Sequence, residues 1–132
     1  MTNLRKSSAQ GPTQRQLRVG EEIRHILSKI LSRGDYSHPL LEGASVIVTE
    51  VRISPDLKHA KVFITTLGGK NMEAIVKVLN EESRPLRNAL GRTLTIKYTP
   101  QLQFRADTSF EEAAKIATLL HSEHVAQDLK KK

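Results

Sequence analysis

Hydrophobic positions recur at two different spacings along this chain, and the spacing changes at Gly and Pro residues. From Gln14 to about Gly34, apolar side chains recur every three to four residues, which predicts an amphipathic helix. Its stripe consists of Leu17, Ile23, Ile26, Leu27, Ile30 and Leu31. Residues 34–44 are rich in Gly, Asp, Ser and Pro and are predicted to form a loop. Residues 1–13 are polar and are predicted to form a disordered basic arm.

Two β-branched runs, residues 45–54 and 60–68, follow the loop and predict a β-hairpin. Val62 and Ile64 alternate with Lys61 and Phe63, so that one face of the second strand is expected to enter a core. In the connection, Pro55 presets the backbone angle and the Asp side chain that follows can bond to its own turn.

Helical spacing returns after the second strand, but it contains a break. Apolar residues recur from Met72 to Leu90, whereas position 82 is Glu and position 85 is Pro. Because Pro disrupts a continuous helix, we expect two helices, at about 71–81 and 84–90, joined by a kink. Ser83 is the expected N-cap of the second helix, with Pro85 in its first turn.

The remaining sequence predicts one strand and one helix. Residues 93–100 alternate as in a half-buried strand, and Pro100 interrupts it, so residues 101–107 are expected to be an extended continuation or a sheet edge. Ser109 and Glu112 have capping-box spacing at the start of a final helix. The apolar face of that helix comprises Phe110, Ala113, Ile116, Ala117 and Leu120. The order of elements predicts an α+β domain, with a three-stranded sheet and helices on one face.

Composition narrows the functional classes. The 132 residues fit one domain, at about 14–120 and including the last helix, followed by a polar basic tail at 121–132. The net charge of +7 favours a polyanionic partner. The absence of Cys excludes disulfides and thiolate metal sites. No apolar run approaches the ~20 residues of a membrane span, and the first residues lack a signal-peptide core, so we expect a cytoplasmic protein without a membrane partner.

Three motifs contain residue types that are typical of catalytic or ligand-binding sites. Ser54, Asp56 and His59 contain the residue types of a hydrolase triad, but an exposed turn lacks an oxyanion hole and a strained nucleophile elbow. His121 and His124 are three residues apart on the last helix, and no third metal ligand accompanies them. We therefore predict no catalytic residue, no metal and no cofactor. A Gly-Gly-Lys sequence at 68–70 is either a chain break or a phosphate contact; it lacks the P-loop spacing.

Basic residues give the stronger functional signal. Arg84, Arg87 and Arg92 lie on the kinked helix pair, while Lys97 and Arg105 lie on the expected strand and its extension. Folded side by side, these elements would form a groove with positive walls, to which the helix N-terminus near Ser83 adds free N–H groups. On the first helix, Arg15 and Arg18 are either solvated or part of a contact surface. The alternative for all of these basic residues is that they form a solvated surface without a partner.

The chain resembles the bacterial ribosome-binding factor A family over about residues 14–120. The resemblance rests on four pieces in order: Arg18-Val19 at the first helix; S-x-D-L-x-x-A-K-V at Ser54, Asp56, Leu57, Ala60, Lys61 and Val62; L-R-x-x-L-G at Leu86, Arg87, Leu90 and Gly91; and P-x-L-x-F-x-x-D-x-S at Pro100, Leu102, Phe104, Asp107 and Ser109.

This resemblance implies a KH-like type II fold and a non-enzymatic assembly factor. Such factors bind the free 30S ribosomal subunit and its 16S rRNA, assist late maturation of precursor 16S rRNA, support growth in the cold, act as monomers and are released with the help of a ribosome-assembly GTPase. The family's A-x-G kink is replaced here by Glu82-Ser83-Arg84. The expected RNA-binding residues are Arg15, Arg18, Lys61, Ser83, Arg84, Arg87, Arg92, Lys97 and Arg105. A KH-like RNA- or DNA-binding module without a ribosomal role is the alternative function, and a small hydrolase is a third.

Overall fold

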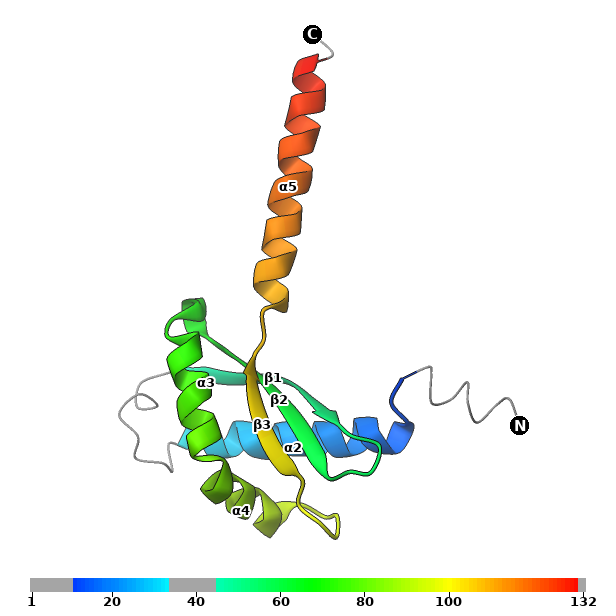
Figure 1. Ribbon diagram of the computed structural model, residues 1–132, viewed down its shortest axis with the longest axis vertical. Helices are drawn as coiled ribbons and strands as arrows, with labels where there is room; N and C mark the ends of the chain where they lie inside the picture. The colour runs from blue at the N-terminus through cyan, green and yellow to red at the C-terminus, as the bar shows by residue number, and fades with distance from the viewer. Residues whose placement is uncertain (1–10, 34–44, 131–132) are drawn as a thin grey trace, which may run out of the picture.

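A computed structural model describes residues 11–33 and 45–130 of the chain. Residues 1–10 of the arm predicted at 1–13 and the whole predicted loop at 34–44 lie outside the described residues. The element order confirms an α+β fold (Figure 1). In chain order the elements are α2 (Gln14–Arg33), β1 (Val46–Ile53), β2 (His59–Thr66), the 3-10 turn η1 (Leu67–Gly69), α3 (Met72–Glu81), α4 (Ser83–Thr93), β3 (Gln101–Ala106) and α5 (Ser109–Lys130).

The three strands form one mixed sheet in the order β1-β2-β3. β1 and β2 are an antiparallel hairpin that pairs Val51 with Val62, and β3 lies parallel to β2, with Phe104 beside Val62. A β-bulge interrupts β1 between Val48 and Glu50. As predicted, helices cover one face of the sheet: α2 crosses behind the strands in Figure 1, α3 contacts β2 and β3, and α4 contacts α2 and β3.

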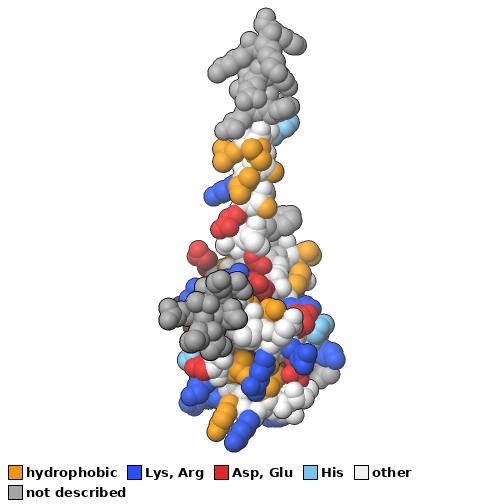
Figure 2. Space-filling view, turned by 90° about the vertical axis from the view of Figure 1, so that its right-hand side faces the viewer, with side chains coloured by type: hydrophobic (Ala, Val, Ile, Leu, Met, Phe, Trp, Pro, Cys, Tyr) orange, Lys and Arg blue, Asp and Glu red, His pale blue; other side chains and the backbone are white. Residues whose placement is uncertain are grey.

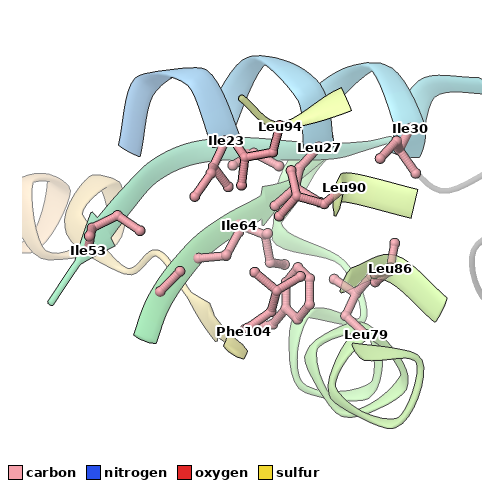
Figure 3. Close-up of a cluster of buried hydrophobic side chains, with 14 of the residues drawn as sticks. Ile23, Leu27, Ile30, Ile53, Ile64, Leu79, Leu86, Leu90, Leu94 and Phe104 are labelled. Atoms are coloured by element: carbon pink, nitrogen blue, oxygen red, sulfur yellow. The ribbon is translucent and has the colours of Figure 1, made fainter. Parts of the chain in front are cut away.

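The core lies between this helical layer and the sheet (Figure 3). α2, β2, α3, α4 and β3 each contribute fully buried side chains to it, whereas the described side chains of α5 do not. These include Ile23 and Leu27 from α2, Val62 and Ile64 from β2, Leu79 from α3, Leu86 and Leu90 from α4, and Phe104 from β3. Each such side chain contributes about 1.5–3 kcal/mol through its removal from water. The predicted inward face of β2 is therefore confirmed.

α2 begins with a reciprocal capping box. The Thr13 backbone N–H donates to Gln16 Oε1 at 2.8 Å, and the Gln16 N–H donates to Thr13 Oγ1 at 3.2 Å. Gln16 is buried, and its Nε2 also donates to the Ile53 carbonyl at 2.9 Å. The capping box thus fixes the start of the helix and ties it to the end of β1. The T-x-x-Q spacing is a sequence signal for this cap, although the helix start was predicted from apolar spacing alone.

The kinked helix pair is confirmed, but its cap differs from the prediction. Ser83 is the first residue of α4, and the preceding position is Glu82, with φ −93° and ψ 14° and no side-chain capping bond. The Leu86 N–H donates to the Glu82 carbonyl at 3.1 Å. Pro85 falls in the first turn, where a missing N–H leaves no helical bond broken.

The strand predicted at 93–100 was wrong. α4 continues to Thr93, residues 95–99 form an irregular connection, and the strand begins at Gln101. The connection is held by side chains: Arg87 Nη2 donates to the Thr99 carbonyl at 2.7 Å, and the Thr95 hydroxyl donates to the Glu22 carboxylate at 3.0 Å. In this connection, side-chain hydrogen bonds take the place of the backbone hydrogen bonds that a strand would make with its neighbour. The edge position expected for the following residues is confirmed, because β3 is an outer strand.

α5 begins at Ser109 as predicted, but without the predicted capping box. The Glu112 N–H donates to the Thr108 carbonyl at 2.9 Å, and the Ser109 N–H and hydroxyl both donate to the Asp107 carboxylate. The helix projects away from the domain (Figure 1). Its predicted apolar face is exposed at Ile116 and Leu120. The expected tail from residue 121 continues the helix to Lys130. No helix in the described part of the chain is long and apolar enough to cross a membrane.

Candidate nucleic-acid interface

The first helix and the 95–99 connection bring two predicted residues together. Arg15 and Arg18 line a cleft of about 490 Å³ beside Glu22, Thr95 and Ile96. Both Arg side chains are exposed, so they can reach an anionic partner. The Glu22 carboxylate, which accepts the Thr95 hydroxyl bond, lies in the same cleft and reduces its positive potential.

Lys97 lies at the exposed tip of the same connection. Its Nζ lies 5.7 Å from the centre of the Tyr98 ring. Tyr98 is 67% exposed, so the pair presents a cation and an aromatic ring to solvent. Both chemical features are used to bind nucleic acids, through phosphates and through stacked bases respectively.

The junction between α3 and α4 presents two of the predicted RNA-binding residues, Ser83 and Arg84. Arg84 is exposed and Ser83 is half-buried in the first turn of α4, where backbone N–H groups have no helical partner. Two carboxylates, Glu81 and Glu82, directly precede them. The positive end of the helix therefore lies next to negative charge, and the exposed guanidinium of Arg84 is the main cationic group at the junction.

Arg87 and Arg92 occupy different environments on α4. The half-buried Arg87 donates from Nε and Nη2 to the carbonyls of Thr99 and Pro100. Its guanidinium therefore holds the 95–100 connection in place. Arg87 also lines a cleft of about 470 Å³ with Lys58, His59, Tyr98, Thr99 and Gln101. Arg92, in contrast, is exposed in the last turn.

Lys61 and Arg105 lie on the face of the sheet that points away from α2, α3 and α4. Leu102 and Phe104 of β3 are buried against the helices, so by alternation Arg105 points away from them. The predicted single groove, with Arg105 beside the helix pair, is therefore wrong. Arg52 is paired in register with Lys61 on the same open face, and it was missing from the predicted RNA-binding residues. The alternation of inward and outward residues along β1 is the sequence signal that could have placed Arg52 on this face. The bulge between Val48 and Glu50 shifts that alternation by one residue.

The hairpin tip is a tight hydrogen-bonded turn. The Ser54 hydroxyl donates to the Asp56 carboxylate at 2.6 Å and accepts the His59 backbone N–H at 3.0 Å. The pKa of Asp56 is lowered mainly by this Ser54 bond and secondly by the Lys58 N–H. Both hydroxyl roles serve the turn, which leaves Ser54 without the base that a nucleophile requires. The geometry supports the predicted structural role of the motif.

The other two motifs are the Gly-Gly-Lys sequence, which is fully described, and the His pair, of which only the His121 side chain is described. Gly68 and Gly69 have positive φ angles of 74° and 69°, which explains the glycines as a chain break. The cleft beside them contains Glu73 and Glu111, whose charges disfavour phosphate. His121 is exposed, whereas the side chain of His124 lies outside the described set. Among the described residues, no three His, Cys, Asp or Glu side chains form a group that could hold a metal.

Figure 2 shows Lys and Arg side chains gathered on the part of the domain far from α5.

Comparison with known proteins shows which family the chain resembles. The family model of ribosome-binding factor A matches residues 15–120. The ribosome-binding factor A of Phenylobacterium zucineum is 50% identical over 120 residues, which cover 91% of this chain and 83% of the relative. The corresponding protein of Azorhizobium caulinodans is 47% identical over 122 residues, covering 92% and 84% of the two chains.

Solved structures agree on the fold. The crystal structure of ribosome-binding factor A from Thermus thermophilus superposes with a TM-score of 0.58 and 20% identity, covering 69% of this chain and 94% of that one. A homology model of the Thermus thermophilus factor, fitted into a cryo-EM map of a 30S complex, gives a TM-score of 0.55 with 20% identity and covers 67% and 91%. This chain belongs to the ribosome-binding factor A family.

Proposed function

We propose that this protein binds the free 30S ribosomal subunit through its 16S rRNA and assists late maturation of precursor 16S rRNA as a non-enzymatic factor. The observation that carries the proposal is family membership across the whole KH-like domain, residues 15–120. The Thermus thermophilus relative fitted into a 30S complex supports the choice of subunit. The finer steps, binding as a monomer in the cytoplasm and release by a ribosome-assembly GTPase, are part of the same proposal.

Charge supplies the physical basis of binding. The chain has 21 Lys and Arg residues against 14 Asp and Glu, and the cations of the candidate interface are largely exposed. Each cation that neutralises a phosphate releases counterions, so affinity should fall steeply as salt concentration rises. Arg15, Arg18, Arg84, Arg92 and Lys97 are the exposed cations that we assign to the interface on the helical side, while Arg87 contributes by holding the connection that carries Lys97.

The substitution Arg84→Glu tests the proposal at the α3–α4 junction. We expect it to lower affinity for purified 30S subunits roughly tenfold, because a phosphate contact becomes a repulsion. Co-sedimentation at several salt concentrations measures the effect, and the thermal unfolding midpoint checks the fold.

Lys115→Glu is the matched control, since Lys115 is an exposed cation on the projecting helix α5. Retained binding by both variants would exclude a contact at the junction. Failure of the unmodified protein to co-sediment at any salt concentration would contradict the proposed function itself.

A further inference from the structure

The sheet has a second face, which no described helix covers. Its outward residues follow from the register: Arg52 of β1 pairs with Lys61 of β2, and Phe63 of β2 pairs with Arg105 of β3. Gln103 lies beside Lys61. We call the residues Arg52, Lys61, Phe63, Gln103 and Arg105 the sheet platform. Lys61, Gln103 and Arg105 are exposed, and the Arg52 side chain is 67% exposed.

At the centre of the platform a guanidinium covers an aromatic ring. The Arg52 guanidinium carbon lies 4.9 Å from the centre of the Phe63 ring, within the range of a cation–π contact. Glu50 fixes this arrangement, because its Oε2 accepts a hydrogen bond from Arg52 Nε at 3.0 Å. Phe63 is half-buried rather than part of the core. Aromatic rings and Arg planes are the two groups on which proteins stack unpaired bases.

Charge flanks this stacking centre on both sides. Arg52, Lys61 and Arg105 lie on three neighbouring strands that are about 4.8 Å apart, so the strands that carry the three cations span about 10 Å across the sheet. Two carboxylates lie near Arg52: Glu50 forms an ion pair with it, and Asp107 at the end of β3, which is bonded to Thr49 and Ser109, has its pKa lowered mainly by the Ser109 hydroxyl and to a smaller extent by the Arg52 charge. Gln103 adds an exposed amide, which can both donate to and accept from base edges.

We infer that the sheet platform is a second RNA-binding surface, which takes an unpaired RNA segment with one base stacked at Arg52 and Phe63. The inference rests on the proposed function and adds a surface opposite the helical side. The positive charge selects a polyanion, and the stacking centre selects single strands, because the faces of bases in a duplex are occupied by their neighbours. An acidic protein segment could also pair with the cations of the platform, but it has no bases to stack on the Phe63 ring, so RNA is the favoured partner.

Binding of a labelled RNA of about 12 nucleotides, measured by fluorescence anisotropy, tests the stacking centre. We expect Phe63→Leu to weaken binding of the single strand about fivefold or more, without changing the salt dependence. Arg52→Gln should weaken binding and reduce the slope of log affinity against log salt by about 0.7. A duplex of the same length should respond to the charge change but not to loss of the ring.

Lys77→Gln is the control, because Lys77 is an exposed cation on α3 in the helical layer. Circular dichroism checks the fold of each variant, and Arg52→Gln remains decisive if Phe63→Leu unfolds. Equal affinity of the unmodified protein and both platform variants for the single strand would overturn the inference. Equal loss of single-strand and duplex affinity in Phe63→Leu would do the same.

Crosslinking to 30S subunits separates RNA from protein partners. A photoreactive p-benzoylphenylalanine at position 103, in place of Gln103, should crosslink to rRNA. Crosslinks to ribosomal proteins alone would overturn the RNA inference and mark the platform as a protein-binding surface. Subunit binding that is normal in Phe63→Leu and Arg52→Gln, with no position-103 crosslink to rRNA, would leave the proposed function standing and remove only the platform.

Discussion

At the scale of single residues, Gly20 shows how closely the helical layer approaches the sheet. A Cβ atom at this position would lie 2.7 Å from the Val51 backbone carbonyl oxygen. Gly in a helix interior costs roughly 0.5–1 kcal/mol relative to Ala, so the close approach of α2 to β1 offsets a real penalty. Gly91 on α4 differs, because a Cβ there would meet the Thr99 side-chain hydroxyl at 2.7 Å rather than backbone.

Gly20→Ala should therefore destabilise the domain by about 1–3 kcal/mol, since the helix must move away from the strand. Gly91→Ala is the matched control and should cost less, because a hydroxyl can rotate and Ala favours the helix. Urea unfolding at neutral pH measures both changes. Equal losses in the two variants would show that backbone contact at Gly20 is not what limits the packing.

Asp107 predicts a pH dependence of stability. The pKa of its carboxyl is lowered by the Ser109 hydroxyl first, then by the Thr49 hydroxyl and the Ser109 N–H. An unfolded Asp has a pKa of about 3.9. Because the folded pKa lies below this value, the bonds stabilise the fold fully above about pH 3.9 and lose this contribution as pH falls through the folded pKa.

Asp107→Asn should consequently be less stable than the unmodified protein at pH 6, and the difference should shrink towards pH 3. Ser109→Ala should raise the pKa of Asp107 towards its ordinary value, which NMR titration of the Asp107 carboxyl carbon measures. A stability difference that stays constant over this pH range would show that the carboxylate bonds do not contribute.

At the scale of elements, each outer strand receives a hydrogen bond from an amide side chain of a neighbouring helix. Gln16 of α2 donates to the Ile53 carbonyl on β1. Asn80 of α3 donates to the Phe104 carbonyl at 3.0 Å and accepts the Phe104 N–H at 2.8 Å on β3. The Asn80 amide thus imitates one pair of strand bonds. Such cover protects outer strands from pairing with other chains.

Asn80→Ala should cost roughly 1–3 kcal/mol, because it leaves both backbone groups of Phe104 without a protein partner. Asn88→Ala on α4 provides the control, since Asn88 is exposed and has the same residue type. Denaturant unfolding gives the free energies, and light scattering detects association through the uncovered strand. If both substitutions proved equally mild, solvent would be replacing the Asn80 bonds.

Local pattern was sufficient for α2, for the hairpin and for the kinked pair, since each has its own periodicity and breaker residues. It failed at the last strand because residues 93–100 and 101–106 both alternate. Bonds between distant residues decide between them: Thr95 binds Glu22 across 73 positions of sequence, and Arg87 binds Thr99 across 12. Such contacts have no local signal, and side-chain bonding overrides strand propensity there.

At the scale of the whole molecule, the same error misplaced the candidate site. Lys97 and Arg105 are eight residues apart, so one continuous strand would have put both on one face. The irregular connection before Gln101 separates them, and Arg105 joins Lys61 on the open face of the sheet. Most of the cations named from the sequence are exposed, although Arg87 is half-buried and Arg52 was missed, and their grouping into a helical side and a sheet platform needed the register of β3.

The projecting helix gives the last prediction. The described side chains of α5, residues 111–121, are all exposed, including Ile116 at 58%, Leu119 at 65% and Leu120 at 61%. A chain that ends after Glu112 keeps the Asp107 and Thr108 bonds at the start of the helix. Its free energy of unfolding should change by less than about 1 kcal/mol, because the lost side chains of Ile116, Leu119 and Leu120 are exposed to water in the folded protein. Full burial of each of them would have contributed about 1.5–3 kcal/mol. Urea unfolding decides: a loss of several kcal/mol would mean that α5 folds back onto the domain in solution.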